Sequence, residues 1–325
     1  MSGRASLLDV RDLSVEFGPA ERPVRAVSHV DLRIGEGEIV GIAGESGSGK
    51  TTLCAALIHA LPRAARITGE VRIGGRSIYA LSPRELRQLR GREIAMILQN
   101  PMTSLDPLFT IGNQLDEVLM TRGDVDAGAR HARSVELLES VHLSAPAERL
   151  RQYPHELSGG MRQRILIAMA SAGAPKLLIA DEPTTALDAT IQEEILVLFR
   201  EIRDRQRTAI AIVTHDLGVI RRICDRVVIM YAGRIAEEGT VAQIFDAPRH
   251  PYTQALLASI PVLDEHRVLL QPIPGQVPDL GDLGDFCPFA ARCPRVVERC
   301  RAEAPRETLL DDRHRVFCWR AGETA

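Results

Sequence analysis

The fold of this chain is decided by the stretch Gly44-Glu45-Ser46-Gly47-Ser48-Gly49-Lys50-Thr51. It matches the pattern G-x-x-x-x-G-K-[ST], follows a short apolar run at residues 38–43, and opens a predicted helix at about 49–61. Glycines let backbone N–H groups turn toward phosphate oxygens, and the helix N-terminus adds its positive dipole. The stretch therefore predicts a nucleotide phosphate site on a strand–loop–helix unit.

Two side chains of this loop carry the predicted chemistry. Lys50 supplies a compact cation to the terminal phosphates, and Thr51 offers its hydroxyl to Mg²⁺. Of the 40 lysines and arginines only Lys50 and Lys176 are lysine, so a chain that otherwise uses arginine keeps lysine where a point charge is needed. We expect the loop, together with Thr52, to bind ATP with Mg²⁺; the alternative is a plain glycine-rich turn before a helix.

Length and composition restrict the class of protein. A chain of 325 residues predicts two domains, at roughly 100–200 residues each. Forty basic against 43 acidic side chains give a net charge of -3, which argues against a protein that binds nucleic-acid backbone. The sequence has neither an apolar run of the roughly 18–20 residues that span a bilayer nor a signal-peptide core, so we expect a cytoplasmic protein.

The order of predicted elements gives the architecture. Helical signals alternate with short apolar strand signals at 94–98, 177–180, 209–214 and 227–230. This alternation predicts an α/β fold with a mostly parallel sheet flanked by helices. Residues 101–173 show only helical signals, which predicts a helical insertion between the strands of this sheet. Beyond residue 247 proline, glycine and cysteine accumulate, so we predict two domains, 1–247 and 248–325, the second a small irregular extension.

A pair of acids follows the apolar run Leu177–Ala180. Because the C-termini of parallel strands line the ligand crevice of such sheets, Asp181 is predicted to reach the Mg²⁺ beside Thr51. Glu182 is predicted to polarise a water in line with the terminal phosphate, as a catalytic residue. The alternative is a pair of solvated acids at a strand end.

A second glycine-rich helix start is Leu157-Ser158-Gly159-Gly160-Met161. Ser158 is predicted to cap the helix that follows, which makes a second anion site. One nucleotide does not need two such sites far apart in one chain, whereas two chains packed head to tail would use both. The alternative is a capped core helix.

Together these motifs resemble the ATP-binding cassette (ABC) family of transporter ATPases. They stand in that family's order: the phosphate loop, Gln99, Leu157–Met161, Asp181-Glu182, Leu187-Asp188 and His215. The resemblance covers about residues 7–245. It implies a P-loop ABC nucleotide-binding fold and hydrolysis of ATP coupled to transport across a membrane.

The resemblance also implies roles for individual residues. It implies that Gln99 takes part in catalysis, contacts Mg²⁺ and couples that site to the membrane partner. It implies that Ser158–Gly160 complete the ATP site of the partner chain and that Asp188 crosses the dimer interface. His215 would hold the γ-phosphate and the attacking water, and Phe17 would stack on adenine. Without this context, His215 reads as a surface histidine and Phe17 as a strand core residue.

Further motifs are similar to the branch of the family that imports oligopeptides, dipeptides, nickel and related solutes. They are Gln99–Pro107, His250-Pro251-Tyr252-Thr253, Pro272-Ile273-Pro274-Gly275 and Cys287–Pro294. The resemblance implies a second ATPase subunit, identical or not, two integral-membrane permease subunits and, indirectly, an extracytoplasmic solute-binding protein. It places the chain on the cytoplasmic side of the cell membrane, as a peripheral protein.

Four cysteines lie close together in the sequence near its end: Cys287, Cys293, Cys300 and Cys318. Their spacing lacks the C-x2–4-C hook of structural zinc sites and matches neither common ferredoxin pattern. Some importers of this branch resemble the chain in carrying a [4Fe–4S] cluster on matching cysteines. We expect such a cluster, with zinc and unligated thiols as alternatives. Arg292, Arg295 and Arg299 would offset its negative charge.

Two other interpretations compete with a transport ATPase: a soluble cassette ATPase of DNA repair or translation, and a binding module that switches without useful turnover. Repair ATPases carry a long coiled coil between the phosphate loop and Leu157, but here that gap shows no heptad run. Translation factors of the family carry two cassettes in one chain, and this chain has one. A binding module without turnover would not need Glu182 and His215.

Overall fold

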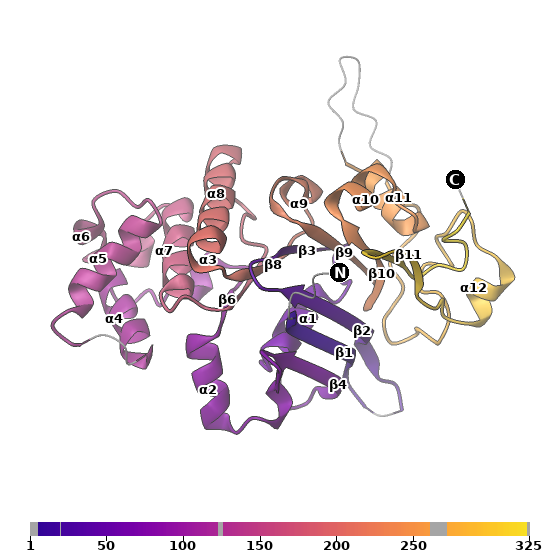
Figure 1. Ribbon diagram of the computed structural model, residues 1–325, viewed down its shortest axis with the longest axis horizontal. Helices are drawn as coiled ribbons and strands as arrows, with labels where there is room; N and C mark the ends of the chain where they lie inside the picture. Colours follow the sequence, from indigo (N-terminus) through magenta and orange to yellow (C-terminus); the bar gives the residue numbers. More distant parts are fainter. Residues whose placement is uncertain (1–5, 20, 123–125, 261–271, 324–325) are drawn as a thin grey trace, which may run out of the picture. The chain divides into compact units, whose positions relative to one another are not determined.

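The computed structural model describes residues 6–19, 21–122, 126–260 and 272–323, and the account below concerns these (Figure 1). The chain divides into two compact units, which are described separately. Unit 1 gathers the described residues within 1–7, 35–38 and 80–212, and unit 2 gathers those within 8–34, 39–79 and 213–325.

Unit 2 contains an antiparallel sheet with the strand order β2-β1-β4-β5. Strand β1 pairs with β4 in the register Leu8↔Ile73. Apolar residues alternate along β1, with Leu8 and Val10 buried, because successive side chains of a strand point to opposite faces. The bounds are β1 Ser6–Phe17, β2 Val24–Gly35, β4 Arg66–Ile73 and β5 Arg76–Ser77.

A second run of strands in unit 2 has the order β11-β12-β10-β9-β3. Strand β3 pairs with β9 in parallel, whereas the pairs β9–β10, β10–β12 and β12–β11 are antiparallel. The bounds are β3 Ile39–Ala43, β9 Arg226–Tyr231, β10 Arg234–Thr240, β11 Thr308–Asp311 and β12 His314–Val316. The helices are α1 Lys50–Leu57, α9 Leu217–Ile223, α10 Val241–Asp246, α11 Pro251–Ala258 and α12 Glu298–Ala302.

Unit 1 combines three neighbouring strands, in the order β8-β7-β6, with a group of helices. Strands β6 and β7 are parallel, in the register Ile97↔Ala180. The strand bounds are β6 Ile94–Ile97, β7 Leu177–Asp181 and β8 Ala209–Val213. The helices are α2 Pro83–Arg92, α3 Pro101–Ser104, α4 Ile111–Arg122, α5 Arg130–Ser140, α6 Pro146–Arg149, α7 Gly159–Ser171 and α8 Ala189–Gln206. Single 3₁₀ turns occur at Ile78–Ala80 and Pro154–Glu156.

The α/β fold predicted from the sequence is confirmed, although its sheets are mixed rather than mostly parallel. The expected small irregular extension is not supported. Two of its segments, β11 and β12, continue the strand order of unit 2, and Glu237 of β10 pairs with Val316 of β12. Backbone groups of the extension therefore find hydrogen-bond partners in a sheet instead of requiring a fold of their own.

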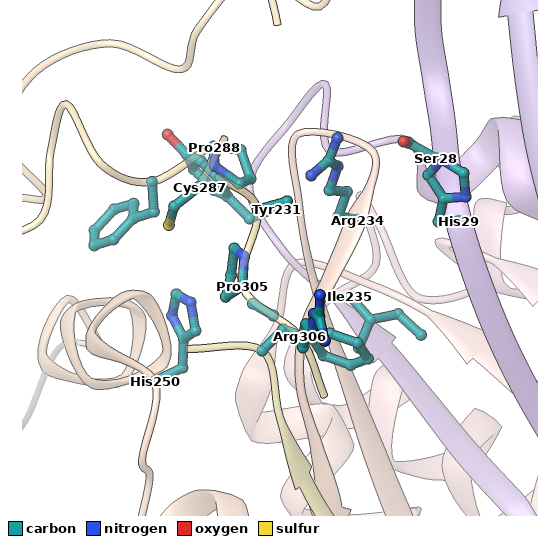
Figure 2. A pocket seen from close by; sticks show the side chains of 14 residues that line it. Ser28, His29, Tyr231, Arg234, Ile235, His250, Cys287, Pro288, Pro305 and Arg306 are labelled. Carbon is teal, nitrogen blue, oxygen red and sulfur yellow. The ribbon is translucent and has the colours of Figure 1, made fainter. Parts of the chain in front are cut away.

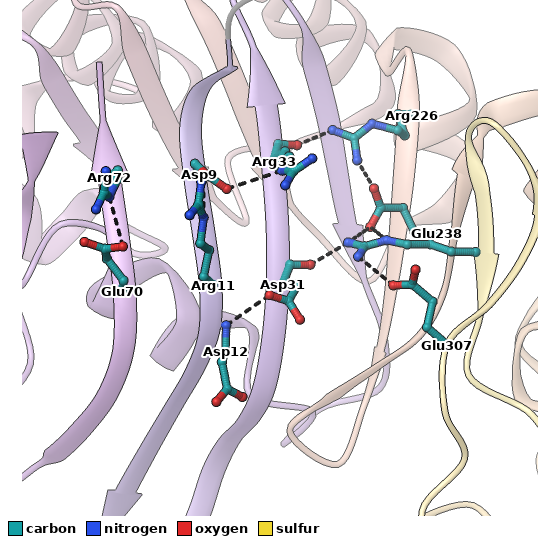
Figure 3. A network of polar contacts seen from close by, with 11 residues as sticks. Asp9, Arg11, Asp12, Asp31, Arg33, Glu70, Arg72, Arg226, Glu238 and Glu307 are labelled. Atoms are coloured by element: carbon teal, nitrogen blue, oxygen red, sulfur yellow. Dashed lines mark hydrogen bonds and ion pairs between the residues drawn. The ribbon is translucent and has the colours of Figure 1, made fainter. Parts of the chain in front are cut away.

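A polar network ties β2 to β10 and β12 within unit 2 (Figure 3). The Arg226 and Arg315 guanidinium groups both form ion pairs with Glu238. They also donate to backbone carbonyls of β2, Arg226 to Arg33 and Arg315 to Asp31. Because a guanidinium presents its donors in a fixed fork, each arginine bridges two strands at once.

The extension and the rest of unit 2 share one apolar core. Tyr231, Tyr252 and Phe289 are buried together, with ring centroids 4.5 Å apart for Tyr231–Tyr252 and 5.2 Å for Tyr231–Phe289. Cys287 and Cys300 belong to the same cluster. The extension thus needs no separate core, and so no metal ion to stabilise a small core of its own.

Replacing Phe289 by leucine is expected to lower the free energy of unfolding by about 1–2 kcal/mol, since aromatic pairs contribute about 0.5–1.5 kcal/mol each beyond their buried area. Phe289 loses its contacts with both Tyr231 and Tyr252 in this variant. Urea titration followed by circular dichroism measures the change. Leu309→Ala on exposed β11 serves as control, and equal stability of both variants with the wild type would contradict the shared core.

Buried Glu237 anchors the start of α11. Its carboxylate accepts hydrogen bonds from the backbone N–H groups of Arg249 (2.8 Å) and His250 (2.9 Å), and it pairs with His314 Nε2 at 2.7 Å. His250 Nδ1 in turn accepts from the Tyr252 N–H at 3.0 Å, which caps the helix. Burial lowers the pKa of His250 to about 4, against the smaller opposing effect of Glu237.

This histidine makes stability depend on pH. Between pH 6.5 and about 4 the unfolded chain binds a proton at His250 that the folded chain rejects, so stability falls with falling pH by about 3 kcal/mol in all. His250→Asn keeps an acceptor for the Tyr252 N–H and removes the titration. From pH 7 to 4 the free energy of unfolding of the wild type should fall toward that of His250→Asn. If the free energies of the two proteins change in parallel with pH, His250 is not the cause of the pH dependence.

In the part of the chain that the structure describes, no helix combines the length and the apolar character that crossing a bilayer requires.

Candidate active site

The glycine-rich loop lies in unit 2 between β3 and α1, as its sequence predicts. Gly44, Gly47 and Gly49 have positive φ angles of 153°, 78° and 93°. A Cβ on Gly44 would lie 2.1 Å from the Met230 carbonyl oxygen, and one on Gly49 would lie 2.3 Å from that of Ala26. Glycine is therefore required at both positions, for its conformation and for the close approach of neighbouring backbone.

The loop folds around the Lys50 ammonium group. Lys50 is 8% exposed, and its Nζ donates to the Gly44 carbonyl at 2.8 Å, the Glu45 carbonyl at 2.9 Å and Ser48 Oγ at 3.2 Å. Gly49 at the N-cap of α1 has no side chain to cover the first N–H groups of the helix. A cation and open helical N–H groups in one loop fit the phosphates of a nucleotide.

His215 belongs to the same unit as this loop. The Thr214 N–H donates to the Ile42 carbonyl at 3.2 Å, which places His215 beside the end of β3, where the loop begins. His215 is exposed, and Asp216 after it caps α9 by accepting from the N–H groups of Gly218 and Val219. Phe17 ends β1 and is half-buried.

The predicted acids lie in unit 1 at the end of β7. Asp181 is buried, whereas Glu182 is half-buried with a φ of 52° and accepts a hydrogen bond from Thr185 Oγ1 at 2.6 Å. Gln99 is exposed just beyond β6. Because β6 and β7 are parallel and in register at Ile97↔Ala180, Gln99 and the two acids share one edge of the sheet. Carboxylate and amide oxygens suit Mg²⁺.

The second glycine-rich helix start also lies in unit 1. Ser158 caps α7 by accepting from the Met161 N–H at 3.3 Å, so the predicted cap is confirmed. Ser158 and Gly159 are exposed, whereas Gly160 is buried. A Cβ on Gly160 would lie 2.7 Å from Ile191 Cγ2, so this glycine lets α7 and α8 pack closely.

Asp188 has a local structural role that was not predicted from the sequence. It is the N-cap of α8, and its Oδ1 accepts from the Ile191 N–H at 2.9 Å. An acid at this position also matches the positive end of the helix dipole.

Comparison with known proteins supplies the family. The ABC transporter family model matches residues 27–185, and the model of the oligopeptide/dipeptide transporter C-terminal region matches residues 236–300. A probable peptide ABC transporter ATP-binding protein, y4tR of Sinorhizobium fredii, is 46% identical and covers 98% of this chain and 96% of its own. This chain belongs to the ABC transporter ATP-binding family.

Other ABC proteins agree over most of the chain. The dipeptide transport ATP-binding protein DppD of Escherichia coli is 43% identical, covering 96% of both chains. The oligopeptide transport ATP-binding protein OppD of Salmonella typhimurium is 45% identical, covering 95% of this chain and 92% of its own. A dimeric ATP-binding cassette, MJ0796 bound to ADP and phosphate, superposes with a TM-score of 0.65 at 30% identity, covering 72% of this chain and 98% of its own.

The predicted [4Fe–4S] cluster of this ABC protein is wrong, and so is the zinc alternative. Among the described residues, no group of three or more His, Cys, Asp or Glu side chains is placed to hold a metal ion. Cys287, Cys293, Cys300 and Cys318 are free thiols. Burial raises the pKa of Cys287 to about 12 and also raises those of Cys293 and Cys318.

The space beside Cys287 is instead an apolar pocket of about 250 Å³ (Figure 2). Its walls come from the β9–β10 hairpin, including Tyr231 and Ile235, and from Cys287 and Pro305 of the extension. The His250 ring faces it from the start of α11. Cys287 therefore contributes packing surface to this pocket, as a small apolar side chain does.

One contact at the phosphate loop was missed by the sequence analysis. Arg292 does not face the thiols as a counter-charge; it forms a bidentate ion pair with Glu45 of the loop. The two residues are 247 positions apart, so no local pattern connects them. The local signal for Arg292 is its position inside the motif Cys287–Pro294, where the sequence predicts that it offsets the charge of a metal cluster.

Proposed function

We propose that this ABC protein is the subunit that hydrolyses ATP to energise an importer of dipeptides or oligopeptides. One observation carries the proposal: a phosphate loop built for nucleotide stands in the same chain as a C-terminal region typical of oligopeptide and dipeptide transporters. Relatives covering nearly the whole chain are named as peptide, dipeptide and oligopeptide transport ATP-binding proteins, which supports the substrate class.

The chemistry follows from the residues of the two units. Lys50 and the N–H groups at the start of α1 hold the phosphates, with Phe17 against adenine. Thr51, Asp181 and Gln99 would hold Mg²⁺, which when bound would supply positive charge to the phosphates. Glu182 accepts the proton of the attacking water, and His215 positions that water and the γ-phosphate.

We propose that each ATP site is completed by a second ATPase subunit. The exposed Ser158 and Gly159 at the start of α7 present an anion site that the chain's own phosphate loop does not require. The related cassette MJ0796 is a dimer, which supports this arrangement. Ser158→Arg should therefore reduce ATP turnover by purified protein roughly tenfold, because a bulky cation fills the anion site. Unchanged turnover would exclude the composite site.

We propose that unit 1 contacts two membrane permeases and holds the protein at the cytoplasmic face of the membrane. Its segment 101–173 follows Gln99 directly and is helical in its described elements. Large apolar side chains are exposed in this segment and just before it, with Leu108 80%, Met120 58%, Leu98 54% and Phe109 51% exposed. A permease surface packed on the segment would cover these side chains. In this proposal residues 1–247 form the nucleotide-binding domain, and an extracytoplasmic binding protein delivers the solute.

Uptake of a labelled dipeptide tests the proposed function. Cells that lack this chain should lose ATP-dependent uptake, and the wild-type chain should restore it while Glu182→Gln does not. A labelled nickel salt and a labelled sugar serve as comparison solutes. Loss of nickel uptake with peptide uptake intact would reject the peptide assignment and retain the ATPase.

A further inference from the structure

The guanidinium group of Arg292 uses all of its hydrogen-bond donors inside unit 2. Nε donates to the Pro274 carbonyl at 2.9 Å, Nη1 to Glu45 Oε2 at 2.7 Å and to the Tyr231 hydroxyl at 3.2 Å, and Nη2 to Glu45 Oε1 at 3.1 Å and to the Ile273 carbonyl at 3.2 Å. An arginine has five such N–H donors in a rigid fork, and each has a partner here.

The Arg292 side chain is buried in unit 2 and does not lie on the surface. Its side chain is 4% exposed, and it lies over the rings of Tyr231 and Phe289 at 5.7 and 6.0 Å from their centroids. A Cβ on Gly275 would lie 3.3 Å from Arg292 Cγ, so the Pro274-Gly275 turn fits closely around it. The ion pair with Glu45 also raises the pKa of the guanidinium.

The extension forms hydrogen bonds with two parts of Glu45, its carboxylate and its backbone N–H. Arg292 holds the carboxylate, and the hydroxyl of Tyr252 in α11 accepts the Glu45 N–H at 2.8 Å. The Glu45 carbonyl accepts from Lys50 Nζ at 2.9 Å. Two segments of the extension, around residues 252 and 292, therefore contact the residue that follows the first glycine of the phosphate loop, and a third, around residue 274, holds Arg292 in place.

This convergence has a direct consequence for ATP. A carboxylate in a phosphate-binding loop repels the polyphosphate unless a cation neutralises it, and the N–H groups of the loop bind phosphate only in one backbone conformation. Arg292 meets both needs, since it cancels the charge of Glu45 and fixes its side chain in place.

We propose that the C-terminal extension braces the phosphate loop through Arg292, which is a positioning residue for ATP binding. The inference rests on the proposed ATPase function and extends it: the extension, absent from a bare cassette, shapes the nucleotide site of its own chain. Occupation of the loop by ATP and ordering of the extension are then thermodynamically linked, each favouring the other.

The test compares the purified full chain with Arg292→Gln, Arg292→Lys, Glu45→Gln and the double variant Arg292→Gln/Glu45→Gln. Arg299→Gln is the matched control, because Arg299 lies in the same extension but pairs with Glu303 and stacks on Trp319. Equilibrium dialysis with labelled ATP gives the affinity, steady-state kinetics give KM and kcat separately, and melting temperatures show that each variant is folded.

Arg292→Gln should raise the Kd and KM for ATP roughly tenfold with kcat nearly unchanged, a typical size for coupling between two sites. Arg292→Lys should recover little, because an ammonium group cannot supply five fixed donors. Glu45→Gln and the double variant should lose less affinity than Arg292→Gln, since neither leaves an unpaired carboxylate beside the phosphates. Arg299→Gln should bind ATP as the wild type does.

Three results would contradict the proposed role of Arg292. The first is an unchanged ATP affinity in a folded Arg292→Gln, and the second is a double variant whose loss of affinity is the product of the losses in the two single variants. The third is a loss of affinity in Arg299→Gln as large as that in Arg292→Gln. Failure of the wild-type chain itself to bind ATP would instead reject the proposed function, so the two failures are distinguishable.

Discussion

Glu182→Gln is expected to lower kcat for ATP hydrolysis roughly 10²–10⁴-fold while ATP still binds, because an amide cannot accept the proton of the attacking water. The side chain suits this role. It follows buried Asp181 at the end of β7, and its φ of 52° turns it away from the course of the strand. The hydrogen bond from Thr185 Oγ1 at 2.6 Å fixes one carboxylate oxygen.

Single-turnover measurements with labelled ATP separate this chemical step from binding. Glu136→Gln serves as the control, since Glu136 is an exposed acid on α5 of the same unit and pairs only locally, with Arg133. If Glu182 is the catalytic base, the control keeps full activity and Glu182→Gln loses nearly all of it. Full turnover by Glu182→Gln would remove Glu182 from the mechanism and leave the rest of the site standing.

Lys50→Ala is expected to weaken ATP binding roughly a thousandfold, the equivalent of two charge-assisted hydrogen bonds at about 2 kcal/mol each. Lys50 Nζ already donates to three oxygens of its own loop, so its position is fixed at the centre of the site before the phosphates arrive. The variant loses the cation and also loses the hydrogen bonds that hold the loop closed.

The chain offers its own control for this experiment. Lys176→Ala removes the only other lysine, whose side chain is 59% exposed and pairs with Glu93. Equilibrium dialysis should show wild-type affinity in Lys176→Ala and a severe loss in Lys50→Ala. Equal affinities of the two variants would show that backbone N–H groups, without the lysine, account for binding.

The parts of the site that could be predicted are those whose structure depends on residues close by in the sequence. The glycines of the loop and the cap at Ser158 depend on backbone conformation within a few residues, and both occur where the sequence places them. The strand that ends at Asp181 is likewise marked by its own apolar run.

The parts that could not be predicted depend on distant neighbours. Cysteine spacing in the sequence does not show how the side chains are placed in space, and among the described residues no group of three or more ligating side chains is placed to hold a metal ion. The partner of Arg292 lies 247 positions away in the sequence. The pairing of β10 with β12 likewise depends on tertiary contacts, because short strands are recognisable only by their neighbours in a sheet.

The bridge from Arg315 to the backbone of Asp31 joins positions that are 284 residues apart, and Arg22 and Asp282 form an ion pair across 260 residues. Contacts of such long range form late, since loop-closure entropy must be overcome first. During synthesis on the ribosome, unit 2 therefore stays incomplete until the strands near residue 315 have emerged. A nascent chain that already carries the phosphate loop lacks the brace on it, so ATP binding matures only after translation of the extension.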